Sequence, residues 1–263
     1  MSRIHPSSEV SSKAEIAEDV EIGPFCLIGP EVKLSSGCKV HSHSIMQGKV
    51  TVGENNEFFP FCSIGAPPQD LTYKEEPTEV IIGEGNIFRE YVSIHRGTMK
   101  DAKLTQIGDY SLFMAYVHLG HDVKFGSHCV VANSTNFAGH VKVGDRVILG
   151  GGCQVSQFVN LGRGAYIGGA TAIDRDIPIF CTAYGNRVKL KGINIIGLRR
   201  HRYEKHDITE VVDFYRTMEA SALSPRAFVE NKENMKEFKQ NQVIQEMVSF
   251  IHDSEVGIAP FIS

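Results

Sequence analysis

The sequence lacks several features that would each have pointed to a class of protein. Lys and Arg number 27 against 31 Asp and Glu, so the net charge is −4 and no overall basic field favours nucleic acid. The six cysteines show no CxxC pair or other metal-ligand spacing, and we interpret them as small buried hydrophobes. The chain has no hydrophobic signal core and no run of ~18 apolar residues. We expect a soluble, cytoplasmic protein without stable membrane insertion and without a nucleic-acid partner.

A six-residue repeat dominates what is present. Apolar residues recur at every sixth position from Val10 to Ile64, from Ile82 to Ile94 and from Ile107 to Ile173, which makes 25 positions without a polar residue. Glycine directly follows 12 of them. Because neither a helix nor a plain strand has this period, the pattern indicates a short strand followed by a corner. Three such hexads would form one coil of a parallel β-helix.

Two interruptions of the repeat predict loops. Between Ile64 and Ile82 the hexad positions would be Asp70 and Glu76, and charges do not belong in the core of a solenoid. The spacing between Ile94 and Ile107 also departs from the period. We therefore expect excursion loops near 65–81 and 95–106, where loops of a solenoid commonly build a binding surface.

The repeat stops after Ile173, and residues 174–194 read as irregular. Helical spacing follows over 206–220 and again over 240–255, and Ser224-Pro225 is a helix-start signal between them. We expect a β fold organised as a parallel β-helix over residues 1–187 and a small helical C-terminal domain over residues 188–263.

The period alone predicts where several polar residues meet. Residues three hexads apart lie above one another, so His121 should stack under Gly139, Gly139 under Gln157, and Asp122 under His140. An imidazole, a carboxylate and a bare backbone N–H would then share one face. These groups are suited to act as a general base, its orienting group and an oxyanion donor.

Two alternatives use the same architecture. His118, His121 and His140 could be zinc ligands, as in the trimeric β-helix hydratases of the gamma carbonic anhydrase type, although His140 should stack over Asp122 instead. A non-catalytic scaffold or ice-binding solenoid would need flat arrays of threonine, whereas this face carries His and Asp.

Several short segments together form a recognisable pattern, and the central one is His118-Leu119-Gly120-His121-Asp122. The others are Pro68-Gln69-Asp70-Leu71, Ile94-His95-Arg96-Gly97-Thr98, Ala138-Gly139-His140-Val141, Gly150-Gly151, Gln157-Phe158, Gly185-Asn186, Asn194 and Gly197-Leu198-Arg199-Arg200. This pattern resembles the bacterial UDP-N-acetylglucosamine O-acyltransferases, which carry out the first step of lipid A synthesis. The resemblance covers essentially the whole chain. It implies a left-handed coil and a homotrimer with active sites between neighbouring β-helices.

The resemblance also implies the chemistry: transfer of an R-3-hydroxyacyl group from acyl carrier protein to the 3-position of a UDP-sugar, with no cofactor and no metal. By position, His121 resembles the general base, Asp122 its orienting group and Gly139 the oxyanion donor. Gly169 matches the position that limits acyl length. Residues that resemble substrate-binding positions are Gln69, Asp70, His118, His140 and Gln157, with Asn194 and Arg200 resembling those that hold the nucleotide.

The chain departs from the usual pattern of that family at Thr72, Ser156, Arg187, Ile196 and His201. These departures leave open whether the acceptor is the 3-hydroxy sugar or its 3-amino analogue. Between Asn186 and His206, seven Lys and Arg stand against one acidic residue. A basic patch of this kind suits an acidic partner such as acyl carrier protein or a phosphate-bearing ligand such as UDP.

Overall fold

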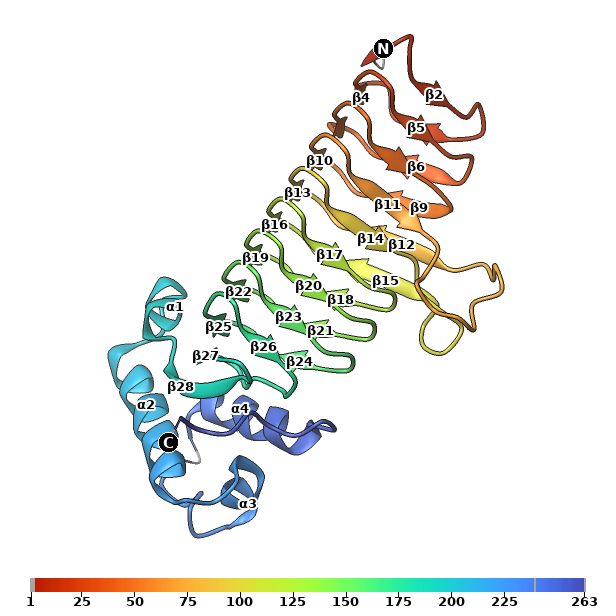
Figure 1. Cartoon of the computed structure of the whole chain (residues 1–263). Coiled ribbons are helices and arrows are strands. Elements are labelled where there is room, and N and C mark those ends of the chain that lie inside the picture. Colours follow the sequence, from red (N-terminus) through yellow and green to blue (C-terminus); the bar gives the residue numbers. More distant parts are fainter. Residues whose placement is uncertain (1–2, 239, 263) are drawn as a thin grey trace.

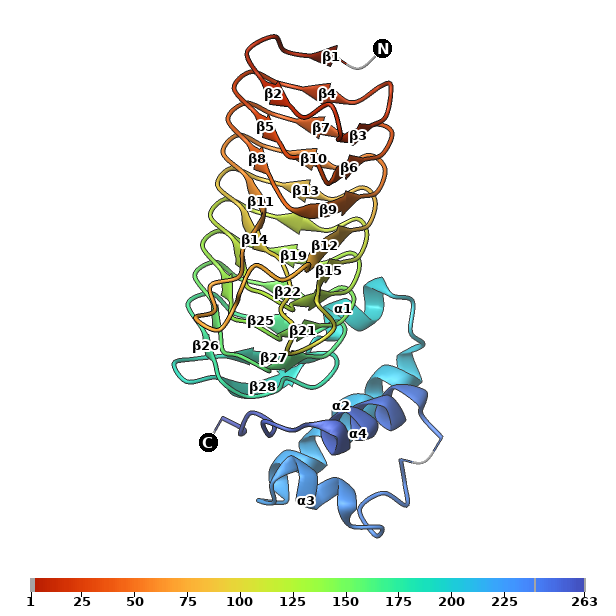
Figure 2. The ribbon, with the colours of Figure 1, turned by 90° about the vertical axis from the view of Figure 1, so that its right-hand side faces the viewer.

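The computed structural model describes residues 3–238 and 240–262. Within them, short strands wind into a three-sided prism, and helices follow at its C-terminal end (Figure 1). Successive coils pair in parallel and lie one above another, as the view turned by 90° shows (Figure 2). The parallel β-helix predicted from the repeat is therefore confirmed.

The prism has three sheets, one on each side. The first contains β1 (Arg3–Ile4), β4 (Glu21–Ile22), β7 (Lys39–Val40), β10 (Glu57–Phe58), β13 (Ile87–Phe88), β16 (Leu112–Phe113), β19 (Val130–Val131), β22 (Ile148–Leu149), β25 (Tyr166–Ile167), β27 (Cys181–Tyr184) and β28 (Lys189–Ile193). The second contains β2 (Glu9–Val10), β5 (Leu27–Ile28), β8 (Ile45–Met46), β11 (Ser63–Ala66), β14 (Ser93–His95), β17 (His118–Leu119), β20 (Asn136–Phe137), β23 (Gln154–Val155) and β26 (Ala172–Ile173). The third contains β3 (Glu15–Ile16), β6 (Val32–Leu34), β9 (Lys49–Val52), β12 (Glu79–Ile82), β15 (Leu104–Ile107), β18 (Lys124–Phe125), β21 (Lys142–Val143) and β24 (Asn160–Leu161).

The residues of the six-residue repeat form the core of the prism. All of them are buried except Val10 and Ile16, which are half-buried at the N-terminal end. Equivalent side chains stack from coil to coil, as in Phe58–Phe88 and Phe88–Phe113, whose ring centroids are 4.8 and 5.1 Å apart. This spacing is close to the ~4.8 Å separation of hydrogen-bonded strands. The side chain at each repeat position therefore contacts the side chain at the equivalent position of the next coil.

One inner corner carries polar side chains instead of apolar ones. Asn56 and Asn86 are fully buried, and the Asn86 side-chain amide donates to Asn56 Oδ1 at 3.0 Å and to the Gly108 carbonyl at 2.9 Å. The Ser111 backbone N–H continues the chain by donating to Asn86 Oδ1 at 2.8 Å. This ladder satisfies backbone groups at a corner, where no strand partner is available.

Both excursion loops leave the prism where the chain passes from the second sheet to the third, which we call the loop corner. In an uninterrupted repeat Val52 would pair with Asp70, but it pairs with Ile82, so the first loop is an insertion into its coil. Ile82 in turn pairs with Ile107 instead of Lys100, which makes the second loop a shorter insertion. Both loops project from the same edge of the prism (Figures 1 and 2). Both loops lie at the interruptions of the repeat, and their common corner is that of His121.

The segment after Ile173, which we expected to be irregular, contains two strands. β27 pairs in parallel with β25, and β28 turns back antiparallel to β27. An antiparallel strand ends the progression of coils and covers an edge that would otherwise offer free backbone groups.

The helices lie at this end of the prism (Figure 1). They are α1 (Ile195–Arg200), α2 (Lys205–Ala220), α3 (Pro225–Glu230) and α4 (Gln242–Asp253). The last three were expected, and Ser224 caps α3 as its sequence suggests, whereas α1 is too short to show a helical period. Among the residues described, no helix combines the length and apolar character needed to cross a membrane.

Candidate active site

The coil register brings His121 and Gly139 together at the loop corner. His118 pairs with Asn136 and Leu119 with Phe137, which places 121 beneath 139 and 122 beneath 140. The His140 backbone N–H donates to the His121 carbonyl at 3.0 Å. A Cβ atom added to Gly139 would lie 2.4 Å from Cε1 of His121, so the imidazole ring stands directly against the glycine. The stacking predicted from the repeat is confirmed.

His121 and Asp122 form a buried pair. The two residues are 7% and 1% exposed, and His121 Nδ1 lies 2.9 Å from Asp122 Oδ2. Burial favours the neutral carboxyl, but hydrogen bonds from His121 and Thr98 outweigh it and hold the pKa of Asp122 below its usual value. An ionised Asp122 accepts the Nδ1 proton of His121. The Nε2 atom of His121 is then left with a lone pair, as a general base requires.

The backbone N–H of Gly139 donates to no group in the part of the chain that the structure describes, while its neighbours Ala138 and His140 donate to Val155 and His121. Gly139 and His121 both line a cavity of about 690 Å³ on the outer face of the second sheet. Other residues that line this cavity are Gln69, His95, His118, Gln154, Ser156, Gln157, Asp174, Asn186 and Arg187. An imidazole and a backbone donor with no described partner therefore open into the same space.

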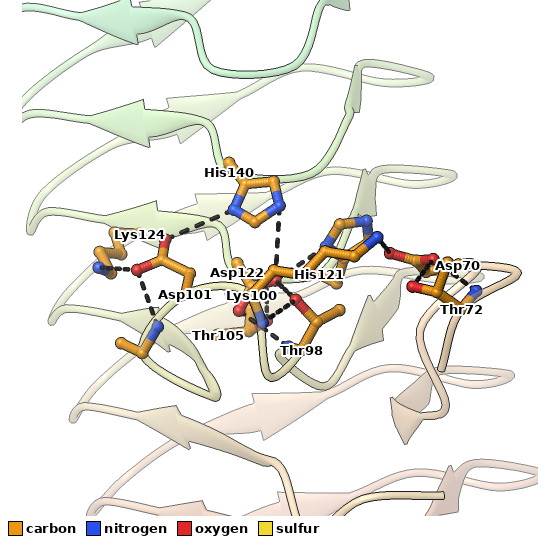
Figure 3. A network of polar contacts seen from close by, with 11 residues as sticks. Asp70, Thr72, Thr98, Lys100, Asp101, Thr105, His121, Asp122, Lys124 and His140 are labelled. Atoms are coloured by element: carbon orange, nitrogen blue, oxygen red, sulfur yellow. Dashed lines mark hydrogen bonds and ion pairs between the residues drawn. The ribbon is translucent and has the colours of Figure 1, made fainter. Parts of the chain in front are cut away.

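The two excursion loops meet beside this pair (Figure 3). From the second loop, Lys100 Nζ donates to Asp70 Oδ2 in the first loop at 2.6 Å. Asp70 also accepts from the backbone N–H and the hydroxyl of Thr72, both at 2.8 Å. The bonds from Lys100 and Thr72 hold the pKa of Asp70 well below its usual value. The loops thus stabilise each other at the rim of the cavity.

His140 lies beside Asp122 and His121 and does not line the cavity. Its Nε2 is 3.8 Å from Asp122 Oδ2, and its Nδ1 is 3.5 Å from Asp101 Oδ2. Its ring stacks on Phe158 with centroids 4.7 Å apart. Gln69, His118 and Gln157 line the cavity, whereas His140 and Asp70 do not. His140 therefore contacts the His121 ring and the Asp122 carboxylate and not the cavity itself.

His95 lines the cavity, although its place in the sequence predicts no role for it in the site. It is 8% exposed, and its Nδ1 has no hydrogen-bond partner among the described residues. Its ring packs edge-on against His118, whose Nδ1 lies 2.8 Å from the Ser93 hydroxyl. Burial, together with repulsion from His118 and His121, lowers the pKa of His95 to about 4. The six-residue spacing does not mark His95, because this residue stands where β14 ends and the second loop leaves the repeat.

This depressed pKa predicts that the protein loses stability in mild acid. An unfolded chain protonates His95 near pH 6.5, whereas the folded chain resists protonation down to about pH 4. The stability contributed by neutral His95 is therefore present above pH 6.5 and falls as the pH drops toward 4, by up to about 3 kcal/mol. Urea unfolding of the wild type and of His95→Gln between pH 7.5 and 4.5 measures this. We expect the free energy of unfolding to decline less steeply with falling pH in the variant than in the wild type. Equal slopes would contradict the lowered pKa of His95.

Asn194 and Arg200, expected to hold a nucleotide, line a separate cavity of about 490 Å³ beside the first sheet and α1. Asn194 Oδ1 caps α1 by accepting from the Gly197 N–H at 2.9 Å, and its amide nitrogen donates to the Gly164 carbonyl at 2.9 Å. The same cavity is lined by His128, Arg146 and His201. Burial, followed by the positive charge of neighbours including Arg146, lowers the pKa of His201. Such a concentration of positive groups favours an anion.

Gly169 lies at another corner, between β25 and β26, and lines neither cavity. A Cβ atom on it would lie 3.2 Å from the Gly151 carbonyl oxygen, so the position is closely packed against the coil below. Its assigned effect on acyl length stays a prediction.

The zinc alternative is not favoured by this geometry. Its three histidines do not converge, because His118 is not among the residues whose possible ligand atoms lie close to those of His121 and His140. Among the described residues, the group whose possible ligand atoms lie within 4.8 Å of one another is His121, Asp122 and His140. Asp122 already accepts from His121 and from Thr98. These bonds fit an orienting carboxylate better than a metal ligand.

A parallel β-helix of hexapeptide repeats defines this chain as a hexapeptide-repeat protein, with a buried His–Asp pair against a backbone amide that has no partner among the described residues. A family model described as UDP-N-acetylglucosamine O-acyltransferase, domain 2, matches residues 176–259. The acyl-[acyl-carrier-protein]--UDP-N-acetylglucosamine O-acyltransferase of Halorhodospira halophila is 40% identical over 98% of this chain and 99% of its own length. That of Sulfurovum sp. is 42% identical over 99% and 98% of the two chains.

The solved structures agree with this assignment. A crystal structure of a UDP-N-acetylglucosamine acyltransferase superposes with a TM-score of 0.94 at 41% identity, over 99% of this chain and all of the other. The chain belongs to the acyl-[acyl-carrier-protein]--UDP-N-acetylglucosamine O-acyltransferase family. The fold expected from the resemblance, a left-handed parallel β-helix with a small helical C-terminal part, is confirmed.

Proposed function

We propose that this enzyme transfers an R-3-hydroxyacyl group from acyl carrier protein to the 3-hydroxyl of UDP-N-acetylglucosamine in lipid A biosynthesis. One observation carries the proposal: His121, held by Asp122 at 2.9 Å, stands against Gly139, whose N–H is unused within the described chain, in one cavity. Acyl transfer between a thioester and an alcohol needs a base for the hydroxyl and a donor for the carbonyl oxygen.

The mechanism follows from these positions. Nε2 of His121 removes the proton of the sugar 3-hydroxyl while that oxygen attacks the thioester carbon. The Gly139 N–H stabilises the negative charge that develops on the carbonyl oxygen. When the tetrahedral intermediate collapses, the carbon–sulfur bond breaks, and the imidazolium of His121 returns its proton to the departing thiolate of the carrier. Asp122 stabilises the imidazolium in the meantime and fixes its tautomer.

The substrates occupy the remaining surfaces in this proposal. Gln69, His118 and Gln157 face the cavity and suit the hydroxyl and amide groups of the sugar and acyl chain. Asp70 and His140 act at its rim. The cationic cavity around Asn194 and Arg200 suits the diphosphate of UDP. Residue 169 sets the length of the acyl chain that the enzyme accepts. Glycine at this position has no side chain and leaves room for a longer acyl chain.

The two cavities lie beside different sheets, so one substrate can use both only if a neighbouring copy of the chain contributes the second. This requirement supports a homotrimer with sites between adjacent prisms. Its packing surface is the outer face of the first sheet, where a row of apolar side chains is partly exposed. The row consists of Ile87, Leu112, Val130, Ile148 and Tyr166. A contiguous apolar row of this kind marks a contact surface.

The basic residues between Asn186 and His206 supply the docking site for the acidic carrier protein, at the end of the prism where β28 leads into the helices. We place the enzyme in the cytoplasm, where thiols stay reduced, because all six of its cysteines are free and buried.

A direct assay tests the proposed function. Purified enzyme is mixed with a panel of R-3-hydroxyacyl carrier proteins and either UDP-N-acetylglucosamine or its 3-amino analogue, and the products are resolved by mass spectrometry. We expect an ester on the 3-hydroxyl sugar and a trimer by light scattering. Preference for the amino sugar would correct the acceptor, and transfer to neither sugar would refute the proposal.

A further inference from the structure

Asp122 is held by a residue of the second excursion loop, Thr98, at both of its carboxylate oxygens (Figure 3). The Thr98 backbone N–H donates to Oδ1 at 2.9 Å, and the Thr98 hydroxyl donates to Oδ2 at 2.6 Å. Thr98 is 3% exposed and Asp122 1% exposed, so water does not compete for these bonds. Hydrogen bonds to a buried charged group are among the strongest in proteins.

The backbone around Thr98 is shaped for this contact. A Cβ atom added to Gly97 would lie 2.2 Å from the Leu104 backbone nitrogen and 2.9 Å from Asp122 Oδ1. Only glycine therefore lets the loop pass close enough for the Thr98 N–H to reach the carboxylate. From the other side, the Asp122 backbone N–H donates to the Thr105 hydroxyl at 2.9 Å. Asp122 is thus enclosed by the start of the loop and by the strand that follows it.

The Oδ2 atom of Asp122 is shared. It accepts from the Thr98 hydroxyl at 2.6 Å and lies 2.9 Å from Nδ1 of His121. The Thr98 donor draws negative charge away from the oxygen that faces the imidazole, and it also fixes the direction of that oxygen. How firmly the carboxylate holds a positively charged His121 therefore depends on Thr98.

We propose that Thr98 is a positioning residue, which orients the Asp122 carboxylate and limits how strongly that carboxylate stabilises the imidazolium form of His121. This inference rests on the proposed function, in which His121 is the base. Thr98 touches no substrate in this scheme and acts only through Asp122. The loop that interrupts the repeat thereby supplies a group that a regular six-residue corner cannot provide.

Other charged or titratable groups also face this pair, and a test must hold them constant. His140 approaches Asp122 from the coil above at 3.8 Å, and Asp101 lies behind His140 at 3.5 Å. Lys124 lies 3.5 Å from Asp101, and Lys100 belongs to the same loop as Thr98. His95 and His118 lie on the side of the second sheet. Substitution of Thr98 alone leaves all of these groups in the chain.

The test is the pH profile of kcat/KM for Thr98→Val, which removes the hydroxyl and keeps the shape of the side chain. Without that donor, Asp122 stabilises the imidazolium more strongly, so the acidic limb of the profile should move to higher pH, by about half to one unit. We also expect kcat at neutral pH to fall about tenfold or more, with KM for both substrates within about twofold. Thr98→Ser, which retains a hydroxyl, should restore the wild-type limb.

Two further variants separate positioning from packing. Thr98→Ala removes the hydroxyl without placing a methyl group against the carboxylate, and it replaces Thr98→Val if that variant does not fold. Thr135→Val removes an equally buried hydroxyl that does not line the cavity. This hydroxyl donates to the Gly150 carbonyl at 3.1 Å. It should lower stability and leave the pH profile unchanged.

An unshifted acidic limb in folded Thr98→Val or Thr98→Ala, or a shift that Thr98→Ser does not reverse, would overturn the inference. A wild-type enzyme that transfers no acyl group would instead refute the proposed function. The two failures are therefore distinguishable.

Discussion

His121→Ala should lower kcat for acyl transfer by about 10³-fold or more while the protein keeps its fold. General bases contribute roughly 10²–10⁴-fold, and the His121 ring stands against Gly139 with Nε2 as its nearer nitrogen, 2.6 Å from a Cβ built on the glycine. The substitution leaves Asp122 bonded to Thr98 through both oxygens, so the buried carboxylate keeps partners. Initial rates with saturating hydroxyacyl carrier protein and UDP-sugar measure the effect, and light scattering shows whether the variant has the same oligomeric state as the wild type.

The matched control is His252→Ala, which removes an exposed histidine from the last turn of α4. It should retain wild-type rates. If His121→Ala kept more than about a tenth of the wild-type kcat, the base would have to be another group and the mechanism proposed for this cavity would be wrong. Unchanged melting temperatures in both variants would exclude unfolding as the cause of lost activity.

Gly139→Ala should be nearly as damaging, with a fall in kcat of about 10²-fold or more. The added Cβ would lie 2.4 Å from Cε1 and 2.6 Å from Nε2 of His121, which is closer than real side-chain contacts allow. The ring relieves this clash by moving out of its present position, against its Nδ1 bond to Asp122 and the His140 ring that packs edge-on at 5.0 Å. A displacement of about 1 Å from productive geometry commonly costs on the order of 10²-fold in rate.

Gly139 does not have a left-handed backbone conformation, so alanine should be tolerated by the fold. Gly151→Ala is the control: it is a corner glycine of another coil, and its added Cβ would lie 3.2 Å from the Asn133 carbonyl. We expect Gly151→Ala to keep most of the activity and Gly139→Ala to keep its stability. Near-normal turnover in Gly139→Ala would show that His121 need not occupy the observed position.

The coil geometry could be predicted because a solenoid is almost one-dimensional. Each coil contacts only the coils next to it, so a residue's neighbour is set by counting three hexads along the chain. That rule placed His121 under Gly139 and Asp122 under His140, and the strand register agrees. The same counting identified the two loops, because Asp70 and Glu76 could not occupy core positions.

The contacts made by the loops could not be predicted in the same way. Thr98, Lys100 and Asp101 belong to no repeat, so no count along the sequence states which side chain they meet. The bond between Lys100 and Asp70 joins loops from different coils, and the T-shaped packing of His95 on His118 begins where a strand becomes a loop. Antiparallel β28 likewise has no period to reveal it.

By itself, the sequence determined the prism, its buried column and the vertical order of the base and the amide, since each depends only on a fixed number of residues per coil. Only the tertiary structure decided what surrounds that pair: which loop residue enclosed Asp122, that Asp101 approached His140, and that Asn194 and Arg200 occupied a different side. Those arrangements depend on where irregular backbone returns in space, and sequence distance does not record this.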